Sequence, residues 1–154
     1  MTAEGVLEAL EATGFAGTLR TSFYLYPVVN AAHILALGML VSAALFMDAR
    51  IFGLARHVPA ATVIGTLRPV AIGALVVAAV TGFLLFSVRP FDYVGNPAFG
   101  IKLVLLTLAV LNAGAATALG DKNLDKPLVR VLAGASIALW LAALLAGRFI
   151  GFLV

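Results

Sequence analysis

Four long apolar runs constrain this chain more than any other feature of its sequence. They cover residues 28–47, 70–88, 98–119 and 131–154. A helix needs about 20 residues to cross the roughly 30 Å of hydrocarbon in a bilayer, and each run is close to that length. Because the bilayer offers no water to backbone groups, each run is expected to be helical. The pattern therefore predicts four transmembrane helices.

Composition agrees with a membrane protein and excludes several other classes. Of the 154 residues, 63% are hydrophobic and 11% are charged, whereas a soluble domain has about 45–50% and about 25%. A soluble enzyme, a disordered segment and a secreted disulfide scaffold are thereby excluded. The chain has no cysteine, which excludes disulfides, thiolate metal sites and iron–sulfur clusters. The scattered net charge of +3 is too small for a nucleic-acid partner.

The expected fold is all-α, an antiparallel four-helix bundle in the membrane that forms one domain over residues 1–154. The predicted spans are about 27–48, 69–88, 98–119 and 129–152. Pro27 and Pro69 suit the first turns of the first two spans. Pro90 disfavours helix at Arg89 and so ends the second span, and Asn96 is the expected N-cap of the third.

The N-terminal segment predicts a short amphipathic helix over about residues 2–13. Glu4, Glu8 and Glu11 share one helical face, and apolar side chains occupy the other. We expect this helix to lie on the outer membrane surface. Gly14 and Gly17 are expected to break it before the first span.

Lysines and arginines predict the orientation of the bundle. The loops after the first and third spans share one side and hold six of them, namely Arg50, Arg56, Arg68, Lys122, Lys126 and Arg130. The opposite side holds four, namely Arg20, Arg89, Lys102 and Arg148. The positive-inside rule then places both loops in the cytoplasm. Both termini of this multi-pass protein would lie on the outer side of the membrane.

Small residues recur at helical spacing within the spans and indicate close helix contacts. Ala74, Ala78 and Gly82 follow one another at four-residue intervals, and Gly147 and Gly151 form a GxxxG pair. One interpretation is a dimer face. The interpretation favoured here is packing within the bundle. Trp140 lies near the middle of its span, so we expect it to face another helix or a bound ligand.

Polar residues inside the spans are the candidate binding site, because each is costly in lipid. His33, Lys102 and Arg148 all fall in the outer third of the predicted membrane, and Asn30 shares a helix face with His33. Together with Trp140 they predict an outer-leaflet pocket for an anionic or carbonyl-bearing ligand, such as a quinone or a haem propionate. In the alternative, Lys102 and Arg148 extend to headgroup phosphates and His33 bonds a carbonyl.

At the inner end, Asp48 and Arg50 close the first span. Asp48 is predicted to form a structural ion pair with Arg68, or with a basic residue of the second cytoplasmic loop. Arg50 is expected to take part in the same structural ion pair.

No metal site is expected, and a haem is a secondary hypothesis. The two histidines, His33 and His57, would lie about 36 Å apart along one helix. They cannot share an iron within one chain, which leaves His33 as a single axial ligand or a site shared across a dimer. No catalytic motif is present, so we do not expect an enzyme.

Several strings of the sequence together resemble a known family. They are Tyr26-Pro27, residues 30–38, 48–55, 82–87 and 93–102, Asn112, Trp140 and residues 147–151. The chain resembles, over about residues 20–152, a bacterial four-helix inner-membrane family of unknown function. The resemblance implies the four-span topology and no particular reaction. It singles out six positions, namely His33, Asp48, Arg50, Asn96, Lys102 and Arg148.

A more distant resemblance is to the four-helix modules of copper-resistance D proteins and cytochrome-b561-type proteins. That resemblance would imply handling of haem or copper. The chain departs from it, because it lacks their additional membrane histidines.

The sequence is therefore consistent with three functions. The first is a non-enzymatic binding or accessory module with an outer-leaflet polar pocket. The second is a redox subunit that binds haem or quinone, and the third is a small transporter. The expected partners are membrane lipid and a homodimer or larger membrane complex.

Overall fold

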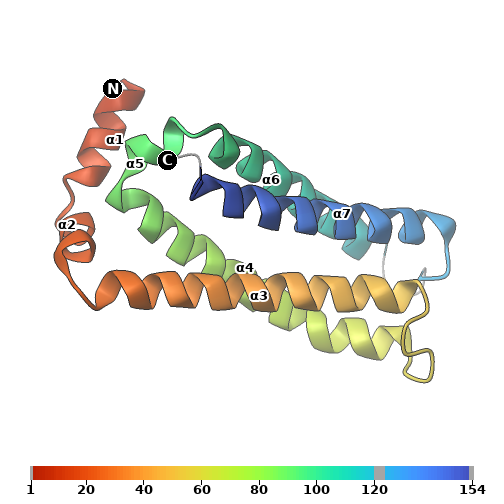
Figure 1. The fold of residues 1–154 in the computed structure, drawn as a ribbon. Helices are drawn as coiled ribbons and strands as arrows, with labels where there is room; N and C mark the ends of the chain where they lie inside the picture. Colours follow the sequence, from red (N-terminus) through yellow and green to blue (C-terminus); the bar gives the residue numbers. More distant parts are fainter. Residues whose placement is uncertain (1, 120–123, 153–154) are drawn as a thin grey trace.

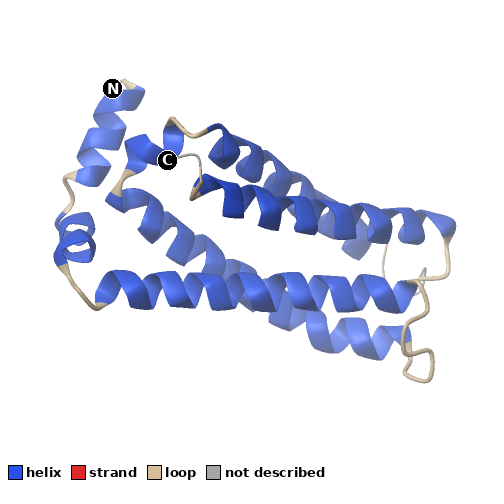
Figure 2. Ribbon diagram, viewed as in Figure 1, coloured by secondary structure: helices blue, strands red, loops and turns tan. Residues whose placement is uncertain are grey.

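The computed structural model describes residues 2–119 and 124–152, and this part of the chain contains helices and no strand (Figure 2). Four of its helices are long and apolar enough to cross a membrane: α3 (Leu25–Ile51), α4 (Ala60–Val88), α6 (Pro97–Ala118) and α7 (Pro127–Ile150). Three are short: α1 (Ala3–Glu11), α2 (Gly14–Thr21) and α5 (Pro90–Val94). The predicted all-α fold with four membrane helices is confirmed.

The four long helices form an antiparallel bundle with α3 and α7 at its centre. α3 packs against α4 and against α7, and α6 packs against α7 (Figure 1). The N-terminal helices, α5 and the end of α7 gather at one end, which we call the terminal end. The loop 52–59 lies at the opposite end. The predicted topology, with both termini on one side, is therefore confirmed.

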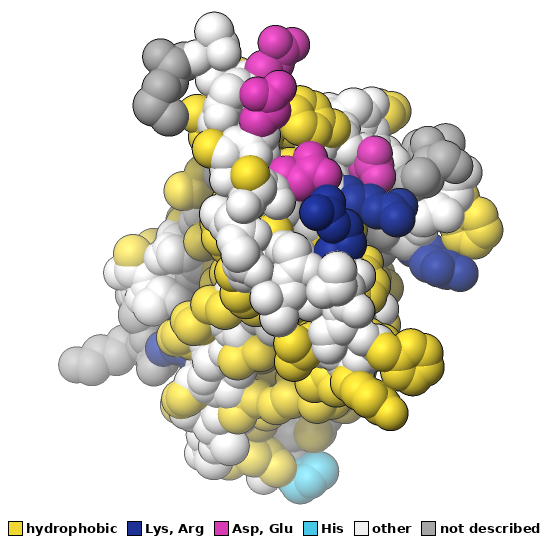
Figure 3. Space-filling model, turned by 90° about the vertical axis from the view of Figure 1, so that its left-hand side faces the viewer, with side chains coloured by type: hydrophobic (Ala, Val, Ile, Leu, Met, Phe, Trp, Pro, Cys, Tyr) yellow, Lys and Arg dark blue, Asp and Glu magenta, His cyan; other side chains and the backbone are white. Residues whose placement is uncertain are grey.

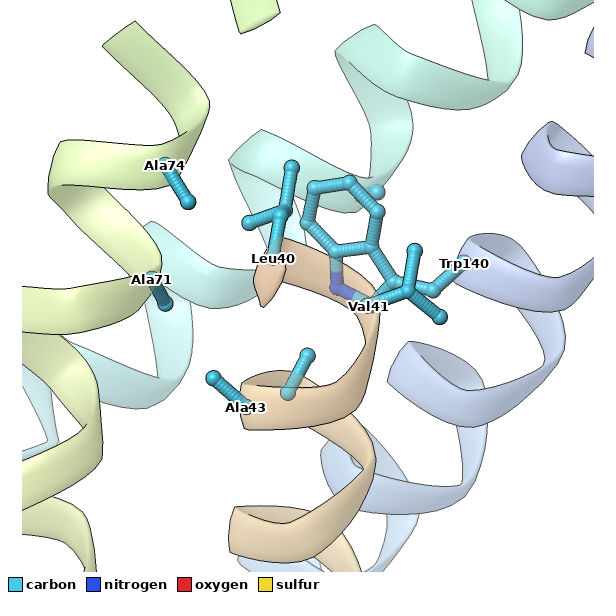
Figure 4. Packing of buried hydrophobic residues seen from close by; sticks show 8 residues of the cluster. Leu40, Val41, Ala43, Ala71, Ala74 and Trp140 are labelled. Atoms are coloured by element: carbon cyan, nitrogen blue, oxygen red, sulfur yellow. The ribbon is translucent and has the colours of Figure 1, made fainter. Parts of the chain in front are cut away.

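The core of the bundle is made mainly of small side chains around one large one. Its buried cluster comprises Leu40, Val41, Ala43, Ala44, Ala71, Ala74, Ala109 and Trp140. Trp140 is 4% exposed and its ring lies beside Leu40 and Val41 of α3 (Figure 4). Alanines on α4 let that helix approach α3 closely, which increases van der Waals contact in a medium without a hydrophobic driving force. The expectation that Trp140 faces another helix is thus confirmed.

Helix α6 lies at the edge of this bundle. In the most apolar stretch of 18 residues of α6, only 11% is buried, whereas this share is 28% in each of the other three long helices. Ala109 is its deepest residue and has no exposed surface. Most of the α6 surface therefore faces whatever surrounds the bundle, which in a membrane is lipid.

Two asparagines fasten α6 to α7. The Asn96 side chain accepts a hydrogen bond from the Ala98 amide (3.0 Å), which confirms it as the N-cap of α6. The same side chain donates to the carbonyl of Ile150 at the end of α7 (3.2 Å). Asn112 donates to the Leu132 carbonyl (3.0 Å). Each asparagine side chain thus donates to a backbone carbonyl of α7, the neighbouring helix.

The second long helix begins earlier than its proline suggested. α4 starts at Ala60, so Pro69 lies inside the helix instead of at its first turn. A proline cannot donate to the carbonyl four residues before it, here that of Gly65. Both residues are on the exposed side of α4, where water or lipid headgroups can satisfy that carbonyl. The second helix ends at Val88, as Pro90 predicts.

The N-terminal segment forms two short helices and not one. Thr13 donates to the Leu10 carbonyl (2.8 Å) at the end of α1, and its hydroxyl accepts from the Ala16 amide (3.3 Å) at the start of α2. The expectation that Gly14 and Gly17 break the helix was wrong, because both lie inside α2. α2 is also anchored, since Ala16 and Leu19 are 1% and 3% exposed.

The burial of Ala109 generates a test of the bundle. Ala109→Leu adds volume where no surface is exposed, and overpacking of this kind costs about 1–3 kcal/mol. We expect the free energy of unfolding, measured by denaturant titration in detergent, to fall by that amount. Ala113→Leu, one turn along the exposed side of α6, is the matched control and should change stability by less than about 0.5 kcal/mol. Equal effects of the two variants would contradict the packing of α6.

Candidate functional site

His33 is held between α3 and α4. Its Nδ1 lies 2.9 Å from Oγ1 of Thr81. Because the Thr81 hydroxyl donates to the Val77 carbonyl, its oxygen is left to accept from the imidazole. We therefore assign the ring hydrogen to Nδ1, a choice that also suits the interaction of His33 with the Ala78 backbone. Nε2 is then the nitrogen with a free lone pair.

The side chain of Lys102 packs against α7 at Gly147, which has no side chain of its own. A Cβ atom added at Gly147 would lie 3.4 Å from both Cε and Nζ of Lys102, so the lysine stem packs directly on α7. Lys102 is also close enough to His33 for their charges to interact. The structure thus brings together two of the three side chains that were predicted to meet. Gly147 is used inside the bundle, as the favoured packing interpretation expected.

The other members of the predicted pocket lie elsewhere. The guanidinium of Arg148 stacks over the ring of Phe152, with 4.7 Å from Cζ to the ring centroid, and the side chain is exposed. Asn30 is exposed on α3, and Trp140 belongs to the buried core. The five residues therefore do not line one pocket. Arg148 turns away because its position at the end of α7 lets it leave the bundle and cover an aromatic face.

Among the described residues, Asp48 does not form the ion pair that was predicted at the opposite end. Asp48 is 8% exposed, and in this part of the chain its Oδ2 has no hydrogen-bond partner. Nε of Arg50 donates instead to the Val58 carbonyl (2.8 Å), which fastens the loop 52–59. Neither Arg50 nor Arg68 makes an ion pair with Asp48 within residues 2–119 and 124–152. Of the other proposed partners, Lys126 and Arg130 form no ion pair with Asp48 in the described segments, and Lys122 lies outside them.

A cavity opens at the terminal end, next to α2, α3, α4, α5 and α7. We call it the terminal cavity, and its volume is about 400 Å³. Its polar lining residues are Arg20, Tyr26, Arg89, Asp92 and Tyr93. Its apolar lining residues include Leu85, Val88 and Ile150. Figure 3, which views this end of the molecule, shows acidic and basic side chains gathered above a broad band of hydrophobic ones.

Two ion pairs border the terminal cavity. Arg20 and Glu11 are joined at 3.1 Å, and Arg89 and Asp92 at 3.9 Å. The Arg89 and Asp92 side chains are 70% and 51% exposed, so solvent screens their attraction and the pair contributes little to stability. The Arg89 guanidinium therefore keeps most of its capacity to donate hydrogen bonds.

Two tyrosines complete the polar side of the terminal cavity. Burial raises the pKa of Tyr93 above its usual value, and the neighbouring Tyr26 and the Asp92 carboxylate raise it further, while Arg89 opposes the shift. The hydroxyl of Tyr93 therefore stays neutral at physiological pH, and it shares a hydrogen bond with Tyr26. Behind it, the rings of Phe86 and Phe99 stack at 5.5 Å between centroids and both contact Tyr93. This aromatic cluster fixes the position of α5 between α4 and α6.

The sequence pointed to part of this cavity. The charge analysis placed Arg20 and Arg89 on the same side of the membrane, although neither was predicted to be a site residue. Arg20 was missed because its position depends on the packing of α2 against α4. Thr13, a favourable N-cap residue, was the local signal for that second short helix.

The residues that could hold a cofactor are few. His57 is exposed in the loop 52–59, at the far end of α3 from His33, so the two imidazoles do not face each other. Within the described ranges no three His, Asp or Glu side chains are grouped as metal ligands. A comparison with protein-family models, curated proteins and solved structures gives no match. The resemblance to a four-helix family therefore stays a prediction.

The contact between His33 and Gly82 generates a second test. Gly82→Ala would place a methyl carbon 3.0 Å from Cε1 of His33, so the imidazole must shift and its hydrogen bond to Thr81 must weaken. We expect a loss of about 1 kcal/mol in the free energy of unfolding. Gly73→Ala, on the same helix with no neighbouring atom within 4 Å, is the control and should be neutral or stabilising. If both variants unfold alike, the imidazole is not held by this contact.

Proposed function

We propose that this protein is a non-enzymatic membrane binding module and that its ligand is an amphiphile with an anionic head. The site is the terminal cavity, in place of the pocket predicted around His33, Lys102 and Arg148. The observation that carries the proposal is the pairing of two guanidinium groups with an apolar wall in one cavity. Arg20 and Arg89 supply the charge, and Leu85, Val88 and Ile150 supply the wall.

The chemistry of the lining favours a phosphate or carboxylate head. A guanidinium presents several donors in a planar fork that matches either group. Asp92 lies 3.9 Å from Arg89, too long for a direct hydrogen bond, so an incoming anion meets a guanidinium without a strong competitor. Tyr26 and Tyr93 share one hydrogen bond, which leaves one hydroxyl proton of this neutral pair to be donated to the anion.

The place of the terminal cavity in the bundle suits an amphiphile. It lies where the long helices end, next to α5, and the ends of membrane-spanning helices lie at the level of lipid headgroups. An anionic head would sit among the arginines, while an apolar tail follows the wall toward the exposed hydrophobic surface of the bundle. A lipid headgroup and a free anionic amphiphile share this chemistry.

The proposal predicts a selective loss on removal of one arginine. In mild detergent, we expect the protein to bind short-chain phosphatidylglycerol more tightly than phosphatidylcholine, measured by calorimetry and by native mass spectrometry. Arg89→Gln removes a charge-assisted contact and should weaken phosphatidylglycerol binding about ten- to hundredfold. Arg148→Gln is the matched control, because Arg148 is exposed at the same end but does not line the cavity.

Two results would contradict the proposal. One is equal affinity for the two lipids in the unmodified protein. The other is an equal loss in Arg89→Gln and Arg148→Gln, which would indicate general surface attraction. The same mass spectra give the oligomeric state of the protein.

We also propose that the terminal end faces the periplasm of a bacterial inner membrane, on the basis of the lysine and arginine bias. Because the chain has no cysteine, single-cysteine variants report orientation directly. In a Gram-negative host, we expect a membrane-impermeant maleimide to label Glu4→Cys in intact cells with a permeabilised outer membrane. His57→Cys should react only after lysis. The reverse pattern would mean that the bundle is inserted the other way round.

A further inference from the structure

Asp48 is a buried ionisable group that the terminal cavity does not use. It lies on α3 near the opposite end of the bundle, is 8% exposed, and has an Oδ2 atom without a hydrogen-bond partner among the described residues. A buried carboxylate is costly unless it is paired, because burial removes the solvation of its charge. A buried polar atom without a partner in a folded protein therefore calls for an explanation.

The polar neighbour of this carboxyl comes from another helix. Ser136 on α7 is 8% exposed and hydrogen-bonds with Asp48. The hydroxyls of other helical residues bond back to their own helices, as those of Thr66, Thr107 and Thr117 do. The Ser136 hydroxyl interacts instead with a carboxyl of another helix, that of Asp48 on α3. Ser136 and Asp48 thus form a polar pair inside the bundle.

Within the described segments, Asp48 forms no ion pair. Arg50, on the same helix, donates instead to the Val58 carbonyl. α7 instead presents the uncharged Ser136 to the carboxyl.

We propose that Asp48 holds a proton in the folded protein and that Asp48 and Ser136 form a proton-binding site within the membrane. A proton on the carboxyl removes the buried charge and makes one of its oxygens a hydrogen-bond donor. A metal ion fits this place less well, because hard cations take about six or more oxygen ligands. The described residues offer no group of three His, Asp or Glu side chains here or elsewhere.

The site is independent of the proposed ligand cavity, which lies at the other end of the bundle. Ionisable side chains that face the interior of a membrane bundle commonly belong to proton or ion pathways. The Asp48–Ser136 pair is the place at which this protein could take up a proton and release it toward the nearer membrane face.

Infrared spectroscopy of the detergent-solubilised protein at neutral pH tests the proposal. Asp48→Asn keeps the shape of the side chain and removes the acid. We expect the spectrum of the unmodified protein to contain the carbonyl stretching band of a protonated carboxyl, which Asp48→Asn abolishes. Asp92→Asn, which changes an exposed aspartate, is the matched control and should leave this band in place.

A second variant covers the case in which Asp48→Asn fails to fold. Ser136→Ala keeps the acid and removes its hydrogen-bond partner, so the band should stay and move to higher frequency. Loss of a protonated-carboxyl band in Asp48→Asn, or its shift in Ser136→Ala, supports the site. If instead Asp48→Asn removes only carboxylate bands, or if the unmodified protein shows no protonated-carboxyl band, Asp48 is ionised and the proposal is overturned.

Discussion

The bundle depends on one constraint, which is that a chain inside hydrocarbon has to satisfy its polar backbone groups without water. The four apolar runs satisfy this constraint by forming helices. Backbone groups that lack a partner within their own helix lie at the helix ends or on the exposed side of the bundle. Pro69 deprives one carbonyl of its donor where α4 is exposed, and Asn96 caps α6 and closes the end of α7 with one side chain. Polar side chains inside the bundle also need hydrogen-bond partners, so the way in which each is partnered indicates its role.

Packing follows from the same medium. Apolar side chains gain little by leaving lipid for one another, so the helices associate through close contact. Alanines of α3 and α4 allow that contact, and Trp140 fills the space that they leave beside α7. α6 shares less of this surface and is held to α7 by Asn96 and Asn112. The bundle is therefore a central α3–α7 pair with one further helix on each side.

The intramembrane polar residues differ in how completely they are partnered. His33 on α3 forms a hydrogen bond with Thr81 on α4. Lys102 packs against Gly147 and interacts electrostatically with the imidazole of His33. Asp48 keeps one oxygen unpartnered. The terminal end combines exposed arginines with tyrosines and an apolar wall, while the opposite end holds a buried carboxyl. The two ends thus differ in chemistry, and we propose anion binding at one and proton binding at the other.

The sequence by itself determined the class of protein, the four helices and their antiparallel order, because run length and hydropathy act locally along the chain. It also located the N-cap Asn96 and the burial of Trp140, since both follow from residue type and place in a span. Only the tertiary structure decided which polar side chains meet. Arg148 lies on Phe152, and Arg20 reaches the cavity from α2. Asp48 interacts with Ser136, whereas Arg50 donates to the Val58 carbonyl. These outcomes depend on the rotation of each helix about its axis, which is set by contacts between helices and leaves no signal in the spacing of one run.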